Sequence, residues 1–350
     1  MKYILLLLAL FLCTGMSGSC RSVPVEQTET EEIEIPEEEE TFPPIEFLPD
    51  GENLPVSVFG EIWAYVIAGR EAALTRGLPI SDIGYFGAEV NTYGALISVP
   101  NRRALPAFNG KVHLVVCCNG YALSHFALLP GSAERKTLIA DLIAATKNFD
   151  GLQIDFENIP QRAGEAFFTF LSELRAGLGN DKMLTIALPA RSRKINNDVY
   201  DYERIAPVVD RILVMAYDEH WSGSAPGPIA SLAWCQRVAS YSLNVIGREK
   251  LIMGLPFYGR AWGRPGHSQA YIYTGIERVI RENNVKGIQR ENGIPTFDYS
   301  ATISVKVYFE DAYSLSTRME MYRSMQITKI GFWRLGQETP AVWKLLSLGE

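Results

Sequence analysis

The stretch that decides the fold is FDGLQIDFENIP at residues 149–160, where acidic residues interrupt an apolar strand pattern. A parallel strand covered on both faces normally reads as a run of Val, Ile and Leu. Residues two apart on a strand share a face, so Gln153, Asp155 and Glu157 are predicted to point one way and the apolar residues between them the other. Because the apolar set suits contact with helices, the polar set is predicted to face the interior of a barrel.

Short apolar runs alternate with helical patterns after residue 50, which is typical of repeated βα units and a parallel sheet. Helical patterns occupy 132–148, 161–179 and 231–243, whereas 91–110 and 191–210 give little helix signal. Eight strands with interposed helices predict an α/β protein of the TIM (β/α)8 barrel class. An open doubly wound sheet is the alternative, although no GxGxxG follows the first strand. The predicted strands are 58–67, 82–90, 111–118, 149–157, 183–189, 211–218, 250–257 and 327–335.

The longest gap between predicted strands runs from 258 to 326. It contains a β-rich stretch, GIPTFDYSATISVKVYFED (293–311), and then the helix-like DAYSLSTRMEMYRSM (311–325). We interpret this gap as a small insertion, about residues 260–310, between strands 7 and 8 on the catalytic face, followed by the last barrel helix. The barrel as a whole is predicted to occupy residues 56–350.

Residues 1–20 have the layout of an export signal: Lys2, an apolar run at 4–12, then small residues before Cys20. The apolar run is too short to span a bilayer. The sequence SGSC (17–20) resembles a bacterial lipoprotein processing site, at which Cys20 would be lipidated and become the mature N-terminus. Plain secretion with cleavage near Ser19 is the alternative. Lipidation predicts a bacterial cell-envelope protein that faces the periplasm or exterior and touches the membrane through its lipid alone.

Residues 21–55 are predicted to be an acidic, disordered tether, because residues 21–50 hold 11 acidic side chains and one basic one. Residues 1–50 therefore carry 2 − 11 = −9, and the remainder carries −7 − (−9) = +2. This nearly neutral part has no basic patch, which argues against a nucleic-acid partner. We expect it to act as a monomer.

Cofactor and metal sites are not predicted. Outside the leader stand Cys117, Cys118 and Cys235, an odd number that does not make a disulfide framework. The four histidines lack metal-ligand spacing, so core or surface positions are the better interpretation for them.

Two carboxyl groups on one face of a strand are the chemically informative feature. They cannot both ionise easily, so one pKa should rise to the range that a general acid needs. Glu157, nearest the open end, is the expected proton donor, and Asp155 would share its proton or orient a substrate amide. Asp150 would anchor the turn or the barrel floor. The competing interpretation is buried acids satisfied by Arg or backbone partners.

In this frame the sequence resembles glycoside hydrolase family 18, the chitinase and N-acetylglucosaminidase family, whose fourth strand carries DxxDxDxE. Asp150, Gln153, Asp155 and Glu157 occupy that pattern, with Gly151 after its first acid. The form DGLQIDFENI, with VYFED at 307–311, most resembles the bacterial spore-cortex and cell-wall N-acetylglucosaminidases. Further stretches that resemble the family are VMAYDEHW (214–221), LIMGLPFYGRAW (251–262) and GFWRLG (331–336).

The resemblance implies a retaining, substrate-assisted cleavage of β-linked N-acetylglucosamine glycans, in which the 2-acetamido oxygen of the substrate is the nucleophile. Glu157 would be the acid and then the base. Asp155 would hold the acetamide N–H and stabilise the oxazolinium ion, Tyr217 would bond the acetamide oxygen, and Trp333 would floor the sugar.

Weaker sugar contacts implied by position are Asp218, Tyr258, Arg260 and Gln153. Gln153 replaces the family's middle Asp; its amide can hydrogen-bond Asp155 but cannot take its proton. Trp63 is expected in the core. Peptidoglycan is the preferred substrate because an envelope protein has it within reach, with chitin-type oligosaccharides next. A non-catalytic, lectin-like lipoprotein is the alternative, and an envelope scaffold is a third possibility.

Overall fold

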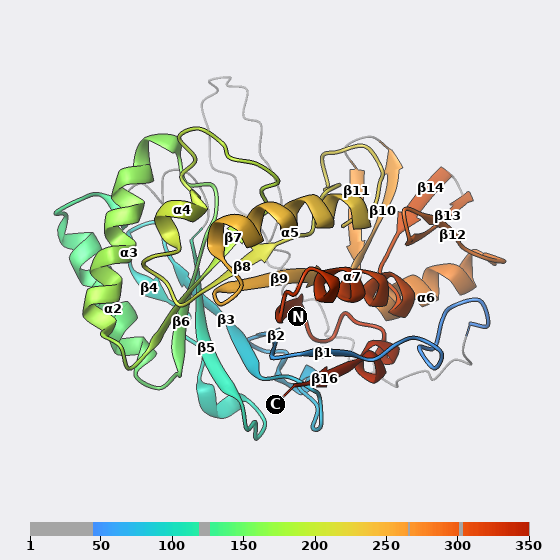
Figure 1. The fold of residues 1–350 in the computed structure, drawn as a ribbon, viewed down its shortest axis with the longest axis horizontal. Helices are drawn as coiled ribbons and strands as arrows, with labels where there is room; N and C mark the ends of the chain where they lie inside the picture. Colours follow the sequence, from blue (N-terminus) through green and yellow to red (C-terminus); the bar gives the residue numbers. More distant parts are fainter. Residues whose placement is uncertain (1–44, 119–126, 265–266, 301–303, 350) are drawn as a thin grey trace, which may run out of the picture. The chain divides into compact units, whose positions relative to one another are not determined.

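The computed structural model describes residues 45–118, 127–264, 267–300 and 304–349. Within them, nine strands form one sheet in the order β2-β15-β9-β8-β7-β6-β5-β3-β4. The short β4 (Leu96–Ile97) pairs antiparallel with β3, while the other eight strands are parallel. Because β2 also pairs with β3, those eight strands close into a barrel (Figure 1). The predicted TIM barrel is confirmed.

Each barrel strand lies inside a range predicted from the sequence. The strands begin and end where the apolar pattern does, because both faces of a barrel strand are covered. They are β2 (Glu61–Ile67), β3 (Asp82–Val90), β5 (Lys111–Cys118), β6 (Gly151–Phe156), β7 (Met183–Pro189), β8 (Arg211–Met215), β9 (Leu251–Pro256) and β15 (Lys329–Trp333).

Four longer helices follow the predicted helical patterns: α2 (Ala133–Thr146), α3 (Gly164–Leu178), α5 (Leu232–Ile246) and α7 (Ala312–Ser324). The side chains of Ser132, Ser231 and Asp311 cap α2, α5 and α7 by accepting a hydrogen bond from a backbone N–H of the first turn. The two connections with weak helix signal carry little helix: η2 (Arg102–Ala104) and the short α4 (Tyr202–Ile205). The β2–β3 connection holds one turn, η1 (Glu71–Ala73). A further turn, η3 (Gln161–Ala163), leads into α3.

The insertion expected between the seventh and eighth barrel strands is present. It forms a second sheet of five strands in the order β11-β10-β14-β13-β12. An amphipathic helix, α6 (Tyr273–Glu282), interrupts it, and the sequence patterns had indicated strands alone in this segment. The strands are β10 (Gly259–Arg264), β11 (His267–Tyr271), β12 (Gln289–Glu291), β13 (Ile294–Ser300) and β14 (Ser304–Tyr308).

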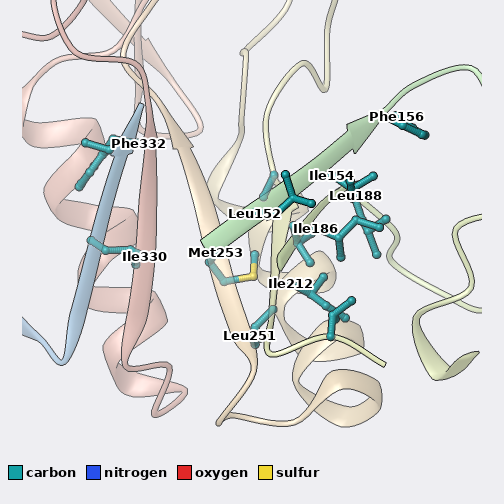
Figure 2. Packing of buried hydrophobic residues seen from close by; sticks show 14 of the residues in the cluster. Leu152, Ile154, Phe156, Ile186, Leu188, Ile212, Leu251, Met253, Ile330 and Phe332 are labelled. Atoms are coloured by element: carbon teal, nitrogen blue, oxygen red, sulfur yellow. The ribbon is translucent and has the colours of Figure 1, made fainter. Parts of the chain in front are cut away.

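The core has two layers, one on each side of the barrel strands. Leu152, Ile154 and Phe156 of β6 belong to the outer layer, which packs against the helices. Figure 2 shows these side chains together with those of Ile186, Leu188 and Ile212 from the neighbouring strands. The inner layer fills the barrel with large side chains from several strands. Burying one such side chain stabilises the fold by about 1.5–3 kcal/mol. The inner layer consists of Trp63, Tyr65, Phe86, Val115, Ala187, Leu213 and Ile252.

Paired polar groups close the amino end of the barrel. His113 Nε2 lies 2.8 Å from Asp82 Oδ1, and the Trp63 ring stacks on the His113 ring at a centroid distance of 4.3 Å. Arg211 forms an ion pair with Glu61. Trp63 is fully buried here, as expected.

The first and last strands of the described chain, β1 (Ser57–Phe59) and β16 (Leu346–Leu348), pair in parallel, and η4 (Pro340–Leu345) precedes β16. Residues 46–55, which the sequence assigned to the tether, belong instead to the same compact unit as the barrel, and Leu54 packs on the outer core. Cys20 and the rest of the predicted signal and tether lie outside the described residues. In the described part of the chain, no helix has the length and apolarity to cross a bilayer.

Candidate active site

The acidic motif stands at the carboxyl end of β6. Its apolar residues face the helices: the Phe156 ring lies 5.7 Å from that of Phe170 on α3. The alternating side chains Gln153 and Asp155 therefore face the barrel interior, as predicted. Glu157 follows the last strand residue, and its backbone N–H donates to the Cys118 carbonyl at 3.0 Å, which continues the ladder to β5.

The electrostatics of the two acids agree with a shared proton. Asp155 is 8% exposed, and its burial, with the charge of Glu157 next, raises its pKa to about 8. Burial also raises the pKa of Glu157, and the charge of Asp218 raises it further. The buried Asp155 Oδ1 accepts no hydrogen bond from the described residues. The site thus holds two neighbouring acids whose pKa values are raised, and one buried carboxyl oxygen that no described group satisfies.

Gln153 lies beneath Asp155, fully buried. Its side-chain oxygen accepts from the Tyr65 hydroxyl, and its Nε2 donates to Thr185 Oγ1 at 3.2 Å. The Gln153 amide, which could have bonded Asp155, instead bonds these side chains of β2 and β7. Gln153 was also expected among the sugar contacts, but the structure places it below the surface that a sugar could touch.

Tyr217 lies just past β8 and faces the same interior. Its ring meets that of Tyr258 edge-on at 6.4 Å. Burial raises the pKa of Tyr217, and the neighbouring Tyr65 and Asp155 raise it further. Its phenol therefore remains a neutral hydrogen-bond donor beside Asp155, as the predicted role requires.

Asp218, Tyr258 and Arg260 form one network. The Tyr258 hydroxyl donates to Asp218 Oδ1 at 2.6 Å, and Arg260 Nη2 lies 3.6 Å from the same oxygen. Tyr258 and Arg260 are each 6% exposed, so they hold Asp218 in place more than they offer a surface to a ligand. Asp218 itself has a φ of 57°, a left-handed conformation uncommon for a residue with a side chain.

Trp333 ends β15 and lies across the barrel mouth, partly exposed. Its ring centroid is 5.3 Å from those of both Tyr65 and Phe86. These contacts fix the indole as a flat apolar surface close to the acids, where a sugar ring could stack.

Asp150 and Gly151 serve the amino end of β6. Asp150 Oδ2 accepts from the Val112 N–H at 2.8 Å and from Arg102 Nη2 at 3.2 Å. Burial opposes ionisation of Asp150, but these two donors outweigh it and hold its pKa below the usual range. A Cβ on Gly151 would lie 2.5 Å from His113 Nδ1, so a larger residue does not fit without movement.

Three residues near the acids were not singled out from the sequence. Tyr65 was detectable because it shares the inward face of its strand with Trp63. Cys117 pairs in register with Asp155, and burial, then Asp155, raises its pKa to about 12, so it stays a thiol. Tyr200 braces the turn that carries Glu157, donating to the Phe156 carbonyl at 3.0 Å and accepting from the Ile159 N–H at 3.1 Å.

Among the described residues, no group of three or more His, Cys, Asp or Glu side chains could hold a metal ion. The three cysteines in that part of the chain are free thiols.

Comparisons with known proteins identify relatives of this chain. The chain is 34% identical over 221 residues to the putative sporulation-specific glycosylase YdhD of Bacillus subtilis, a match that covers 59% of this chain and 52% of that one. It thus spans about half the length of that relative. The cortical fragment-lytic enzyme of the same organism is 25% identical over 300 residues, with 79% of this chain and 70% of the relative covered.

Among solved structures, the spore cortex-lytic enzyme SleL of Bacillus cereus shares the fold, with a TM-score of 0.72 at 20% identity, over 84% of this chain and 76% of that chain. The sequence model of glycosyl hydrolases family 18 matches residues 99–338, which include both acids, Tyr217 and Trp333. The chain therefore belongs to glycosyl hydrolase family 18.

Proposed function

We propose that this chain is an exported hydrolase that cleaves β-linked N-acetylglucosamine glycans, peptidoglycan above all, by a retaining, substrate-assisted mechanism. The observation that carries the proposal is the pair Asp155 and Glu157, two partly or fully buried carboxyls with raised pKa values at one strand end. A protonated acid and a neighbouring carboxylate can coexist there at neutral pH.

In the proposed reaction, Glu157 gives its proton to the leaving glycosidic oxygen while the substrate's 2-acetamido oxygen bonds to the anomeric carbon. Asp155 accepts the acetamide N–H and stabilises the positive oxazolinium ion, and Tyr217 donates to the acetamide oxygen. Glu157, now a carboxylate, takes a proton from the water that opens the ring. Two displacements at one carbon retain its configuration.

Asp218 is the other acid near the pair, and its contacts support a mechanism in which the substrate, not this carboxylate, is the nucleophile. Asp218 Oδ1 already accepts from the Tyr258 hydroxyl and lies near Arg260, so this acid is engaged in a buried network. A substrate lacking the 2-acetamido group should therefore not turn over, and a thiazoline mimic of the oxazolinium should inhibit. Efficient hydrolysis of a plain glucoside would contradict the mechanism.

Peptidoglycan is the proposed substrate on two grounds. The relatives include a putative sporulation-specific glycosylase and cortical fragment-lytic enzymes. The first 20 residues also read as a lipoprotein signal, which would place the enzyme on the cell envelope, anchored by a lipid on Cys20 and working as a monomer. Cys20→Ala should move the protein from the membrane fraction to the soluble fraction. Unchanged membrane association would contradict lipidation.

A lectin-like lipoprotein is the second candidate, and Gln153 is the observation that favours it. Where the family pattern has an acid, this chain has an amide held by Tyr65 and Thr185. Saturable binding of a chitooligosaccharide without any turnover by the wild-type protein would support that candidate over the hydrolase.

A further inference from the structure

Two arginines lie together at the catalytic end of the barrel, outside the acid pair. Arg334 directly follows Trp333, and Arg70 lies three residues past the end of β2. The two connections pack on each other. The Leu335 N–H donates to the Tyr65 carbonyl at 3.0 Å, and a Cβ on Gly336 would lie 3.2 Å from the Cβ of Ala73, in the turn that Arg70 opens.

Neither guanidinium has a carboxylate within 4 Å among the described residues. The Arg334 guanidinium donates one hydrogen bond, from Nη1 to the Leu335 carbonyl at 3.2 Å, and Arg70 is exposed. Three other cations at this end are paired: Arg191 with Asp198, Lys194 with Asp201, and Arg260 with Asp218. Most of the donors of the two arginines thus remain available.

Nearby acids are engaged elsewhere. Glu338 accepts from the Gln337 N–H at 2.9 Å and from Trp343 Nε1 at 3.3 Å, and burial raises its pKa. Glu71 accepts from the Gly69 N–H and the Tyr85 hydroxyl.

The electrostatics at Arg334 reflect this shortage of counter-charge. Burial lowers the pKa of its guanidinium, the charge of Arg70 lowers it further, and Glu338 only partly opposes them. A partly buried guanidinium that feels a second positive charge favours an anionic ligand.

We propose that Arg334 and Arg70 bind a carboxylate carried by the glycan, beside the sugar that lies on Trp333. This assignment rests on the proposed glycosidase function and names the substrate class within it. Paired guanidinium groups hold carboxylates through charge-assisted, bidentate hydrogen bonds. Peptidoglycan offers two such carboxylates. Where the peptide has been removed, the lactyl group of muramic acid carries a free carboxylate; where the peptide is present, the peptide itself carries one. Chitin has neither, so the site selects for muramic-acid strands.

The test compares kcat/KM on four substrates of equal length: a chitooligosaccharide, a peptide-free muramic-acid strand, that strand with its lactyl carboxyls amidated, and a peptide-bearing strand. Arg334→Gln and Arg70→Gln should each lower kcat/KM on a carboxylate-bearing strand by roughly 10- to 100-fold, as expected for a charged hydrogen bond. On the chitooligosaccharide they should change it less than about twofold. The matched control is Arg76→Gln, an exposed arginine in the same β2–β3 connection.

The substrates also distinguish the two sources of the carboxylate. Loss confined to the peptide-free strand identifies the lactyl group, and loss confined to the peptide-bearing strand identifies the peptide. Two results together would overturn the assignment. Arg334→Gln would lower kcat/KM equally on the amidated and the free strand, and Arg70→Gln would leave kcat/KM unchanged on the amidated, the free and the peptide-bearing strand.

A binding measurement separates this inference from the proposed function. In the Glu157→Gln background, affinity for the muramic-acid strand should exceed that for the chitooligosaccharide, and adding Arg334→Gln should abolish the difference. Selective binding without turnover in the wild type would refute the hydrolase and keep the carboxylate site. Turnover of both glycans without any such selectivity would refute the site and keep the hydrolase.

Discussion

The hydroxyl of Tyr65 donates a hydrogen bond to the side-chain oxygen of Gln153, across the interior of the barrel from β2 to β6. With Thr185 on its other end, the Gln153 amide is held at a fixed height below Asp155. Gln153 cannot accept a proton, so protons at the catalytic end are shared by Asp155 and Glu157 without a third acid beneath them. The pH dependence of the enzyme should report this arrangement.

Gln153→Glu places a carboxyl group below Asp155 with almost no change of shape. Three interacting acids lose their last proton at a higher pH than two. The alkaline limb of the kcat/KM profile should therefore move upward by roughly 0.5–1 pH unit. Gln153→Leu, which adds no acid, should leave the limb in place and lower stability by about 1–3 kcal/mol, because the Tyr65 hydroxyl loses its partner. An unmoved limb in Gln153→Glu would contradict the shared-proton arrangement.

Asp155→Asn should stabilise the fold while it removes activity. The pKa of Asp155 is raised to about 8 in the folded protein, mainly by burial. When the pKa of an acid is higher in the folded than in the unfolded protein, its contribution to the free energy of unfolding is fully present below the unfolded pKa. That contribution is lost as the pH rises from about 4 through about 8. Denaturant unfolding should thus show a gain of roughly 1–3 kcal/mol at pH 8 and almost none at pH 4. A gain independent of pH would mean that charge burial is not its cause.

Tyr258→Phe tests the network around Asp218. Loss of the 2.6 Å bond to Asp218 Oδ1 should lower kcat/KM by roughly 10-fold and stability by about 1–2 kcal/mol. Tyr308→Phe is the matched control, because Tyr308 donates a bond of the same length to Glu291 within the insertion. It should alter stability alone. Similar kcat/KM values for the two variants would show that Asp218 needs no support from Tyr258.

Gly151→Ala tests the packing at the amino end of β6. The added Cβ would lie 2.5 Å from His113 Nδ1 and 2.8 Å from the Met183 carbonyl, so the strand or its neighbours must move. We expect a loss of about 1–3 kcal/mol in denaturant unfolding. Gly287→Ala is the control, since nothing lies within 4 Å of a Cβ there. An equal effect of both changes would mean that the strand adapts freely.

The barrel strands and the acid pair could be predicted because their signals are local. An apolar run marks each barrel strand. The alternation of side chains along a strand is enough to place Asp155 on the inner face. The 91–110 connection showed no helical pattern, and it forms only β4 and η2. Helix α6 was missed, although its apolar residues at 273, 276, 279 and 280 recur at helical spacing, because the β-rich sequence after it dominated the interpretation of the insertion.

Contacts between distant residues could not be predicted in this way. Tyr65 and Gln153 are 88 positions apart, and Asp218 and Tyr258 are 40 apart. A single sequence indicates which face of a strand each side chain occupies. It does not give the register between strands, which determines which side chains contact each other. Hence the sequence did not show that the Gln153 amide bonds Tyr65 and Thr185. It also did not show that the connections carrying Arg334 and Arg70 pack on each other.

The measurement that tests the central claim most directly is digestion of purified peptidoglycan and chitooligosaccharides by residues 46–350, beside Glu157→Gln, with products identified by mass spectrometry. We predict products with a new reducing N-acetylglucosamine end from the wild type, and turnover lower by ~10²–10⁴ in Glu157→Gln with binding retained. Products formed equally by both proteins, or by neither, would contradict the assignment of Glu157 as the general acid of this glycosidase.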